Sequence, residues 1–329
     1  MKQTEYIFNS SDKLELNAVY SAPKYAAAMM LTSIDGERYT GAVYFTDHTT
    51  KFSEVTRAEL DELIQAESPN RPTKAGRHPM MDKIIRFLRS DDPNLQNVYL
   101  YGPAGSGKTQ VAMTIANELG LPFYFTNCVM SKYDLIGQPD ASGKYHPSPF
   151  YKAFTEGGLF LLDEFDASDP SAGIVLNAAL ANRRFDFPIV GNTEAHPNFR
   201  VIAAGNTPGM GATDMFTERQ ALDAATLDRF VSMHFDYDPE VEKSICPDRE
   251  ALEFIRALRK SARKHDIRIV LGYRTLARIV SMSKEFTVDE ILTFAIFKGM
   301  DTDIVQMLVN ECPQNNKYTK AAHQYDVCY

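Results

Sequence analysis

The residues with the clearest chemical meaning in this sequence form a glycine-rich segment that ends in lysine and threonine. Residues 102–109 read Gly-Pro-Ala-Gly-Ser-Gly-Lys-Thr and fit the pattern G-x-x-x-x-G-K-[ST]. Glycines let backbone N–H groups close around phosphate oxygens, and the N-terminus of a following helix adds partial positive charge. The lysine of such a loop reaches the β- and γ-phosphates, and the last hydroxyl holds Mg²⁺. The predicted nucleotide-binding residues are Gly102, Pro103, Ala104, Gly105, Ser106, Gly107, Lys108, Thr109 and Gln110.

Two carboxylates follow a short apolar run further along the chain. Residues 159–162 are Leu-Phe-Leu-Leu, which predicts a buried parallel strand, and Asp163 and Glu164 come where that strand ends. Ligands of open α/β sheets bind at this end of the strands. We expect Asp163 and Thr109 to hold Mg²⁺, and Glu164 to orient and deprotonate the attacking water. The alternative is an acidic N-cap for the helix that begins near Ser171.

A third polar group ends another predicted strand. Residues 198–204 are mostly apolar and are followed by Gly205, Asn206 and Thr207. In a parallel sheet a polar side chain here lies between the two carboxylate motifs, so we expect Asn206 to contact the γ-phosphate or its water. A simple Gly-Asn turn is the alternative.

The periodicity of apolar residues predicts the elements that must position these side chains. Strands are expected at residues 97–101, 122–126, 158–162, 198–204 and 231–237, and helices at 79–89, 109–119, 149–155 and 171–181. A further strand at 185–190 is expected to precede a turn at Gly191 and Asn192. This alternation predicts an α/β fold with a parallel sheet between helices.

The rest of the chain predicts accessory parts. Residues 29–34 and 40–45 flank Asp35-Gly36, a hairpin signal, and residues 56–66 suggest a helix, but this small α/β unit carries no catalytic motif. Helical periodicity returns at 250–264, 273–280, 288–297 and 303–310, and the polar residues after 313 are expected to fray. The expected divisions are an N-terminal accessory unit at 1–70, a nucleotide-binding core at 71–237, a small helical lid domain at 238–312 and a tail at 313–329.

Composition limits the function classes. The chain has 329 residues, 44% hydrophobic and 24% charged, as in a soluble globular protein of about two domains. Its net charge of −8 gives no overall basic field for nucleic acid, and a basic face at 256–264 is more simply a solvated one. The four cysteines form no C-x-x-C pair, which argues against structural zinc and disulfides. Without an apolar leader or an 18-residue apolar run, we expect a cytoplasmic protein with no membrane partner.

The order of these parts resembles an AAA+ ATPase, a P-loop NTPase. Residues 134–137, 150–158 and 159–166 look like the helix-2 insert and acidic motif of the MoxR and dynein-related branch. Residues 205–211 and 222–230, which read Gly-Asn-Thr-Pro-Gly-Met-Gly and Leu-Asp-Ala-Ala-Thr-Leu-Asp-Arg-Phe, are similar to CobS-like proteins, including ones that bacteriophages encode.

This resemblance, which covers residues 78 to about 300, implies roles for single residues. The phosphate loop becomes Walker A, Asp163 and Glu164 become Walker B, and Asn206 becomes sensor 1. Arg229 becomes an arginine finger that acts on the nucleotide of the next subunit, although Arg219 lies close enough in sequence to take or share that role. Arg274 becomes sensor 2 in the lid. Asn127 is placed to act as a switch on Glu164.

The resemblance also implies partners. It predicts ATP with Mg²⁺, a homo-oligomeric ring, usually a hexamer, and loops at 137–147 and 187–197 that face its pore. The favoured function is ATP-driven remodelling of a protein substrate, often with a partner that carries a von Willebrand-type metal site. A nucleic-acid motor or McrB-like NTPase is the main alternative. A scaffold that binds nucleotide and barely turns it over is a third, against which the full set of Asp163, Glu164 and Asn206 argues.

Overall fold

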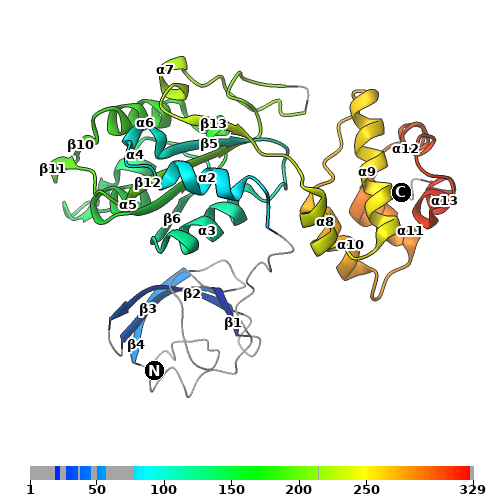
Figure 1. Cartoon of the computed structure of the whole chain (residues 1–329), viewed down its shortest axis with the longest axis horizontal. Helices are drawn as coiled ribbons and strands as arrows, with labels where there is room; N and C mark the ends of the chain where they lie inside the picture. Colours follow the sequence, from blue (N-terminus) through cyan, green and yellow to red (C-terminus); the bar gives the residue numbers. More distant parts are fainter. Residues whose placement is uncertain are drawn as a thin grey trace.

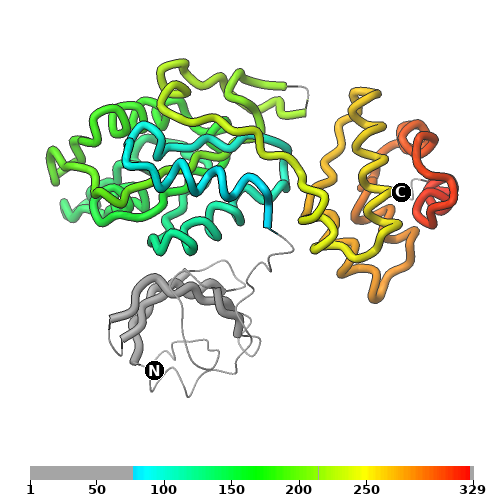
Figure 2. Tube along the Cα trace, in the orientation of Figure 1, coloured from blue at the N-terminus to red at the C-terminus, as the bar shows by residue number. Residues whose placement is uncertain are grey.

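A computed structural model describes residues 19–22, 27–35, 38–45, 50–56, 77–213 and 215–326. From residue 77 onward the chain forms an α/β core and a separate helical lid, which lie side by side (Figure 1). The chain leaves the last strand of the core, passes through a short connection and enters the first helix of the lid (Figure 2).

The core is built on five parallel strands in the order β13-β5-β12-β9-β6. They are β5 (Asn97–Tyr101), β6 (Phe123–Thr126), β9 (Gly158–Leu162), β12 (Phe199–Gly205) and β13 (Val231–His234). Strand β12 lies between β5 and β9, with Gly205 opposite Tyr101 and Ala203 opposite Leu162. The carboxyl ends that precede the phosphate loop, Asp163 and Asn206 therefore meet at one edge of the sheet.

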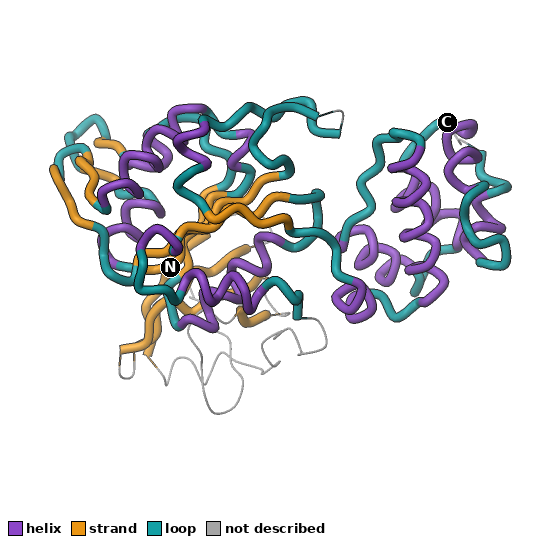
Figure 3. The backbone as a smooth tube through the Cα atoms, turned by 45° about the horizontal axis from the view of Figure 1, so that its top comes forward, coloured by secondary structure: helices purple, strands orange, loops and turns teal. Residues whose placement is uncertain are grey.

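Helices cover both faces of this sheet (Figure 3). One face packs against α2 (Met81–Leu88) and α3 (Lys108–Leu119), and the other against α4 (Tyr133–Ile136), α5 (Pro149–Glu156) and α6 (Pro170–Asn182). In β9, Leu159 and Leu161 enter the first core, whereas Phe160 and Leu162 enter the second. Burying each such side chain stabilises the fold by about 1.5–3 kcal/mol, so β9 is held firmly and places the acids that follow it. The predicted α/β class is confirmed.

A hairpin projects from the second face, and its turn differs from the prediction. Strand β10 (Arg184–Phe187) pairs antiparallel with β11 (Gly191–Glu194), so the turn lies at residues 188–190 and not at Gly191 and Asn192. Pro188 cannot donate a ladder hydrogen bond, which ends β10. Phe187 is buried against Phe150 and Phe154 and anchors the hairpin. A second small hairpin, β7 (Gln138–Pro139) with β8 (Tyr145–His146), lies within residues 137–147, where the resemblance predicts a loop.

The lid is helical and has its own apolar core. Its helices are α8 (Pro239–Ile245), α9 (Arg249–Lys264), α10 (Tyr273–Met282), α11 (Val288–Ile291), a π-helical turn (Leu292–Phe297), α12 (Thr302–Val309) and α13 (Lys317–Ala322). Residues such as Leu258, Leu276 and Leu308 are fully buried between them. The expected helices at 250–264, 273–280, 288–297 and 303–310 are thereby confirmed.

The expectation that residues after 313 fray is wrong for the part that the structure describes. Helix α13 packs on the lid, with Tyr318 only 1% exposed and stacked against Phe254. Tyr325 is also buried, against Phe297. The segment is polar on average, but these two aromatic side chains supply enough apolar surface to hold it in place.

The N-terminal unit contains four antiparallel strands in sequential order, β1 (Val19–Ala22), β2 (Ala27–Asp35), β3 (Arg38–Phe45) and β4 (Thr50–Thr56). The predicted hairpin around Asp35 is confirmed by the pairing of β2 with β3. The helix expected at 56–66 lies outside the described residues, apart from Thr56, which ends β4.

Candidate nucleotide-binding site

The phosphate loop joins β5 to α3 and has a backbone that needs glycine. Gly105 and Gly107 have φ angles of 74° and 88°, in the left-handed region. A Cβ on Gly102 would lie 2.2 Å from the carbonyl oxygen of Phe235, which is backbone and cannot move aside cheaply. The glycines therefore serve both the turn and the close approach of the segment that follows β13.

Lys108 begins α3 and is only 7% exposed. Its Nζ donates to the carbonyl oxygens of Gly102 at 2.8 Å and Pro103 at 3.0 Å, and to Oδ1 of Asn206 at 3.3 Å. Burial lowers the pKa of this ammonium to about 8, and the charge of Asp163 opposes that shift. The lysine thus stands at the centre of the site, between the loop and Asn206.

The carbonyl oxygens of the loop are turned toward protein donors. The hydroxyl of Tyr237 donates to the carbonyl oxygen of Ala104 at 2.8 Å, and the amide of Tyr273 donates to that of Gly105 at 2.9 Å. Within the described part of the chain, the amides of residues 104–107 have no hydrogen-bond acceptor, and the buried hydroxyl of Ser106 has no partner. Unpaired donors beside a helix N-terminus fit phosphate oxygens.

Asp163 and Thr109 form the expected oxygen pair. The hydroxyl of Thr109 donates to Oδ2 of Asp163 at 2.5 Å, and the amide of Glu164 donates to Oδ1 at 2.9 Å. Hydroxyl and carboxylate oxygens are donors that Mg²⁺ prefers, so the residues fit this cation. Glu164 has a φ of 53°, unusual for a residue with a side chain, and this turn directs it away from the line of β9.

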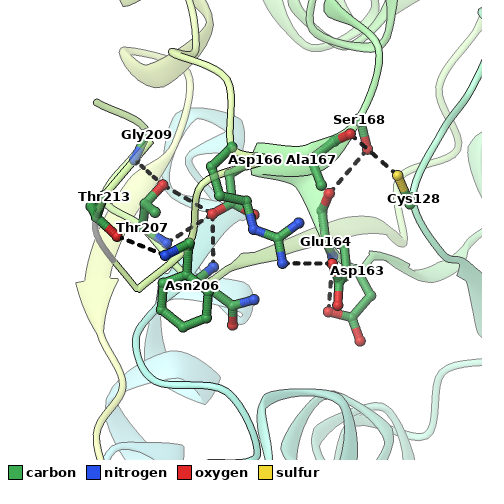
Figure 4. Close-up of polar contacts among 12 residues, drawn as sticks. Cys128, Asp163, Glu164, Asp166, Ala167, Ser168, Asn206, Thr207, Gly209 and Thr213 are labelled. Atoms are coloured by element: carbon green, nitrogen blue, oxygen red, sulfur yellow. Dashed lines mark hydrogen bonds and ion pairs between the residues drawn. The ribbon is translucent and has the colours of Figure 1, made fainter. Parts of the chain in front are cut away.

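Asp166 organises the end of β12 and was not among the predicted site residues. It belongs to a short 3₁₀ turn (Phe165–Ala167) and its side chain is fully buried. Its Oδ2 accepts from the amides of Asn206 at 2.9 Å and Thr207 at 2.8 Å, and from the Thr207 hydroxyl at 2.9 Å (Figure 4). These bonds fix Asn206, whose side chain faces Lys108. The sequence signal that could have indicated Asp166 is its position as a third acidic residue, after Asp163 and Glu164, behind the apolar strand.

A cleft of about 680 Å³ lies over the loop, between core and lid. Its polar end contains Lys108, Thr109, Asp163, Glu164 and Asn206 together with the loop backbone. Its other end is lined by His78, Met81, Val241, Ser244 and Ile245. These residues offer a more apolar wall, which suits the nucleobase of a nucleotide. Arg274, the predicted lid residue, lines the cleft at the start of α10.

His78 is a lining residue that sequence reasoning missed. Its ring stacks on Phe235 at 4.0 Å, and its Nε2 lies 3.0 Å from the carbonyl oxygen of Asp236. Burial lowers the pKa of this imidazole. No motif surrounds His78, and its partners lie far along the chain, so its place was not predictable from local sequence.

The two candidate arginines occupy different places. Arg219 Nη2 lies 2.8 Å from Oε2 of Glu164, at the edge of the cleft. Arg229, just after the short helix α7 (Ala224–Leu227), instead donates through Nε to Oδ1 of Asn177 on α6 at 3.1 Å and does not line the cleft. Among the described residues Asn127 makes no hydrogen bond to Glu164, so its role as a switch stays a prediction.

The basic face of α9 is largely paired within the chain. Arg256 and Arg259 both contact the buried carboxylate of Glu242, Arg263 lies 3.6 Å from Asp236, and Lys264 lies 2.6 Å from Glu311. Intramolecular pairing of these cations weakens the local argument for nucleic-acid binding. In the described part of the chain, no helix is long and apolar enough to cross a membrane.

Comparison with known proteins gives a family match within the core. Residues 97–230 match a protein family described as "AAA domain (dynein-related subfamily)". Uncharacterized proteins of Staphylococcus aureus strains USA300 and COL are 32% identical over 171 residues, which is 48% of this chain and 62% of theirs. The chain therefore matches less than two thirds of the length of these relatives.

Solved structures give weaker matches. NtrX from Brucella abortus is 14% identical, with a TM-score of 0.45, over 68% of this chain and 52% of NtrX. A putative ATPase from Cytophaga hutchinsonii is 19% identical, with a TM-score of 0.39, over 67% of this chain and 65% of that protein. The family match alone confirms the dynein-related AAA domain that the motifs predict. The match ends at Phe230, so it does not include the lid. It also does not test the likeness to MoxR and CobS-like proteins.

Proposed function

We propose that the chain is a cytoplasmic, Mg²⁺-dependent ATPase that assembles into a ring and remodels a protein partner. The observation that carries the proposal is the convergence of Lys108, Asp163, Glu164 and Asn206 on one cleft beneath the lid. These residues come from the ends of three neighbouring strands. Together they offer a phosphate cation, a metal ligand, a general base and a polar group for the attacked phosphate.

The residues divide the hydrolysis of ATP between them. The loop amides and Lys108 bind the β- and γ-phosphates, and Arg274 reaches the phosphates from the lid. Thr109 and Asp163 hold Mg²⁺, which when bound neutralises charge on the phosphate oxygens. Glu164 accepts a proton from the water that attacks the γ-phosphorus, while Asn206 orients that water, and ADP and phosphate leave.

Assembly into a ring follows in this proposal from the place of Arg229. This arginine lies on the α6–α7 edge and outside the cleft of its own chain, so it can stabilise the transition state only in another subunit. The resemblance to MoxR and CobS-like ATPases, bacteriophage ones included, favours a hexamer. In such a ring the β7–β8 and β10–β11 hairpins face the pore, where exposed Ile189 and Val190 meet the protein substrate or a von Willebrand-type partner.

The test is ATP hydrolysis by the purified chain, with and without Mg²⁺, combined with mass measurement of the assembly. Lys108→Ala should lose detectable ATP binding because it removes the cation that faces the phosphates. The control is Lys83→Ala, which removes an exposed lysine of α2 outside the cleft. Unchanged ATP affinity in Lys108→Ala would refute the proposal. Turnover that rises with DNA and falls steeply with salt would favour the McrB-like alternative.

A further inference from the structure

We propose that Arg219 is a positioning residue that acts within its own chain, by tying Glu164 to the buried carboxylate of Asp166. This inference rests on the proposed ATPase function, in which Glu164 is the base. It assigns to Arg219 a role different from that of Arg229, although both arginines lie in the same connection between β12 and β13.

The first step is the anchor. Asp166 is fully buried, and its Oδ2 accepts the three hydrogen bonds from Asn206 and Thr207. Its Oδ1 receives no hydrogen bond and faces Nε of Arg219 at 3.6 Å. A buried carboxylate whose cation is removed is strongly destabilised, because its charge is left without compensation. Arg219 therefore stays beside Asp166, because moving away would leave a buried carboxylate without a counter-charge.

The backbone beside Arg219 is held at the same place. The amide of Gln220 donates to the carbonyl oxygen of Asp166 at 2.8 Å. The guanidinium also lies over the ring of Phe216, 5.8 Å from its centroid, and the side chain is only 13% exposed. Main chain and side chain are thus both fixed against the turn that follows β9, which disfavours a reach into another subunit.

The second step is the contact with the base. Nη2 of Arg219 lies 2.8 Å from Oε2 of Glu164, whose side chain is 43% exposed. A guanidinium is a rigid planar fork, so an arginine anchored at Asp166 can present a second nitrogen to Glu164 in a defined direction. The contact uses Oε2 and leaves Oε1 for a water. Arg219 therefore orients a side chain that the exposed, left-handed turn at Glu164 would otherwise leave free.

The third step is the shared support. The carboxylate that anchors Arg219 also holds the backbone of Asn206, so one buried group sets the positions of both the base and the residue that orients the water. Catalysis depends on such positions to within fractions of an ångström. Loss of Arg219 should lower kcat by about ten- to a hundredfold, up to the lower limit of a full general-base effect, because Glu164 itself is still present. Nucleotide affinity should change little, because Arg219 does not line the cleft.

The experiment mixes variants so that a ring contains two kinds of chain. Arg219→Ala is paired with Lys108→Ala in one mixture and with Arg229→Ala in another, in rings shown by native mass spectrometry to contain both chains. An arginine that acts in its own chain cannot rescue a neighbour. The first mixture should therefore show no more than the residual activity of its Arg219→Ala chains, since no chain has both Lys108 and Arg219. The second should regain activity, since the Arg229→Ala chain keeps a complete cleft and receives Arg229 from its neighbour.

The outcomes separate the possibilities. Rescue in the first mixture, or wild-type kcat in Arg219→Ala alone, would overturn the proposal, whereas no rescue in the second mixture would instead contradict the action of Arg229 across subunits. If Arg219→Ala fails to assemble, Arg219→Gln combined with Asp166→Asn removes both buried charges together, and this chain takes its place in both mixtures. A wild-type protein without ATPase activity would instead refute the proposed function, which is a different result.

Discussion

The nucleotide cleft and the edge formed by α6 and α7 use their charged groups in opposite ways. In the cleft, Lys108 is bonded to loop carbonyls and Thr109 to Asp163, and just behind its wall Arg219 lies against Glu164. At the edge, Arg229 contacts the neutral amide of Asn177. Among the described residues no carboxylate lies within ion-pair distance of Arg229. The charged groups around the cleft are paired within the chain, whereas Arg229 at the edge is held by one hydrogen bond to a neutral partner.

In the proposed ring, this difference would divide the catalytic parts between subunits. A charge that is paired and buried is expensive to move, so the groups of the cleft act where they stand. A guanidinium on a neutral partner loses one modest hydrogen bond when it moves to a phosphate. The predictions below test this division, first at the edge and then in the cleft.

The edge should show the largest effect. Arg229→Ala is expected to bind ATP normally and to lose about a thousandfold or more in turnover, the size of an arginine-finger effect. Steady-state kinetics and ATP titration measure the two quantities. Arg249→Ala, which removes an 89% exposed arginine of α9, is the matched control. Mixing Arg229→Ala with Lys108→Ala should restore activity. Specific activity that stays constant with dilution down to a proven monomer would contradict a division between subunits.

Within the cleft, Glu164→Gln should have the next largest effect. The amide keeps the shape of the carboxylate but cannot take a proton from water, so turnover should fall about a hundredfold or more while ATP binding remains. Mixing this variant with Arg229→Ala should restore activity only at interfaces where an intact cleft meets an intact Arg229. Near-normal turnover in Glu164→Gln rings would mean that this residue only begins the turn after β9.

The pH dependence of ATP binding should report the buried lysine. Burial lowers the pKa of Lys108 from 10.5 to about 8, so its ammonium is charged below pH 8 and neutral above it. ATP affinity should be flat between pH 7 and 8 and then weaken by about tenfold per unit until the pKa of the bound form is reached. Between about pH 8 and 10.5, Lys108 binds fewer protons in the folded protein than in the unfolded chain. Its contribution to the free energy of unfolding therefore rises with pH over this interval. Lys108→Arg keeps its charge and should lose the slope; an identical slope in that variant would point to another group.

The smallest effect is expected where the lid meets the loop. A Cβ on Gly272 would lie 2.8 Å from the carbonyl oxygen of Ala104 and 2.9 Å from that of Gly105. Gly272→Ala should weaken ATP binding about fivefold, near the lower end of overpacking costs of about 1 kcal/mol. Gly173→Ala on α6 is the control, since its nearest neighbour is the hydroxyl of Thr226 at 3.3 Å. Equal affinities in the two variants would show that the close packing at Gly272 is irrelevant to binding.

The sequence predicts the parts whose chemistry lies in adjacent residues. The loop at 102–109 and the pair Asp163 and Glu164 follow from local spacing, and the approach of Asn206 follows from the strand order. Asp166 and Arg219 were not assigned their contacts because their partners lie far apart in the chain. The phosphate-loop bonds of Tyr237 and Tyr273 likewise depend on how the lid settles on the core, for which no local pattern exists.

The same limit explains the two errors of the fold prediction. Gly191 and Asn192 have the composition of a turn, but the burial of Phe187 and the missing donor of Pro188 move the turn earlier. The segment after 313 is polar on average, and two buried tyrosines outweigh that average. In both cases a few tertiary contacts overrode local composition.

The hydrogen bond between the amide of Tyr273 and the carbonyl oxygen of Gly105 makes the phosphate loop the pivot of a lever. Helix α10 begins at this bond, and the hydroxyl of Tyr273 accepts from the amide of Asp238, at the entry to the lid. A small tilt at the pivot is therefore passed to the whole lid, and the displacement grows with distance from the loop. Helices α12 and α13, at the far end of the lid (Figure 1), sweep the longest arc. Under the proposed ATPase function, the arrival or loss of a single phosphate would thus be converted into a displacement at the periphery of the lid.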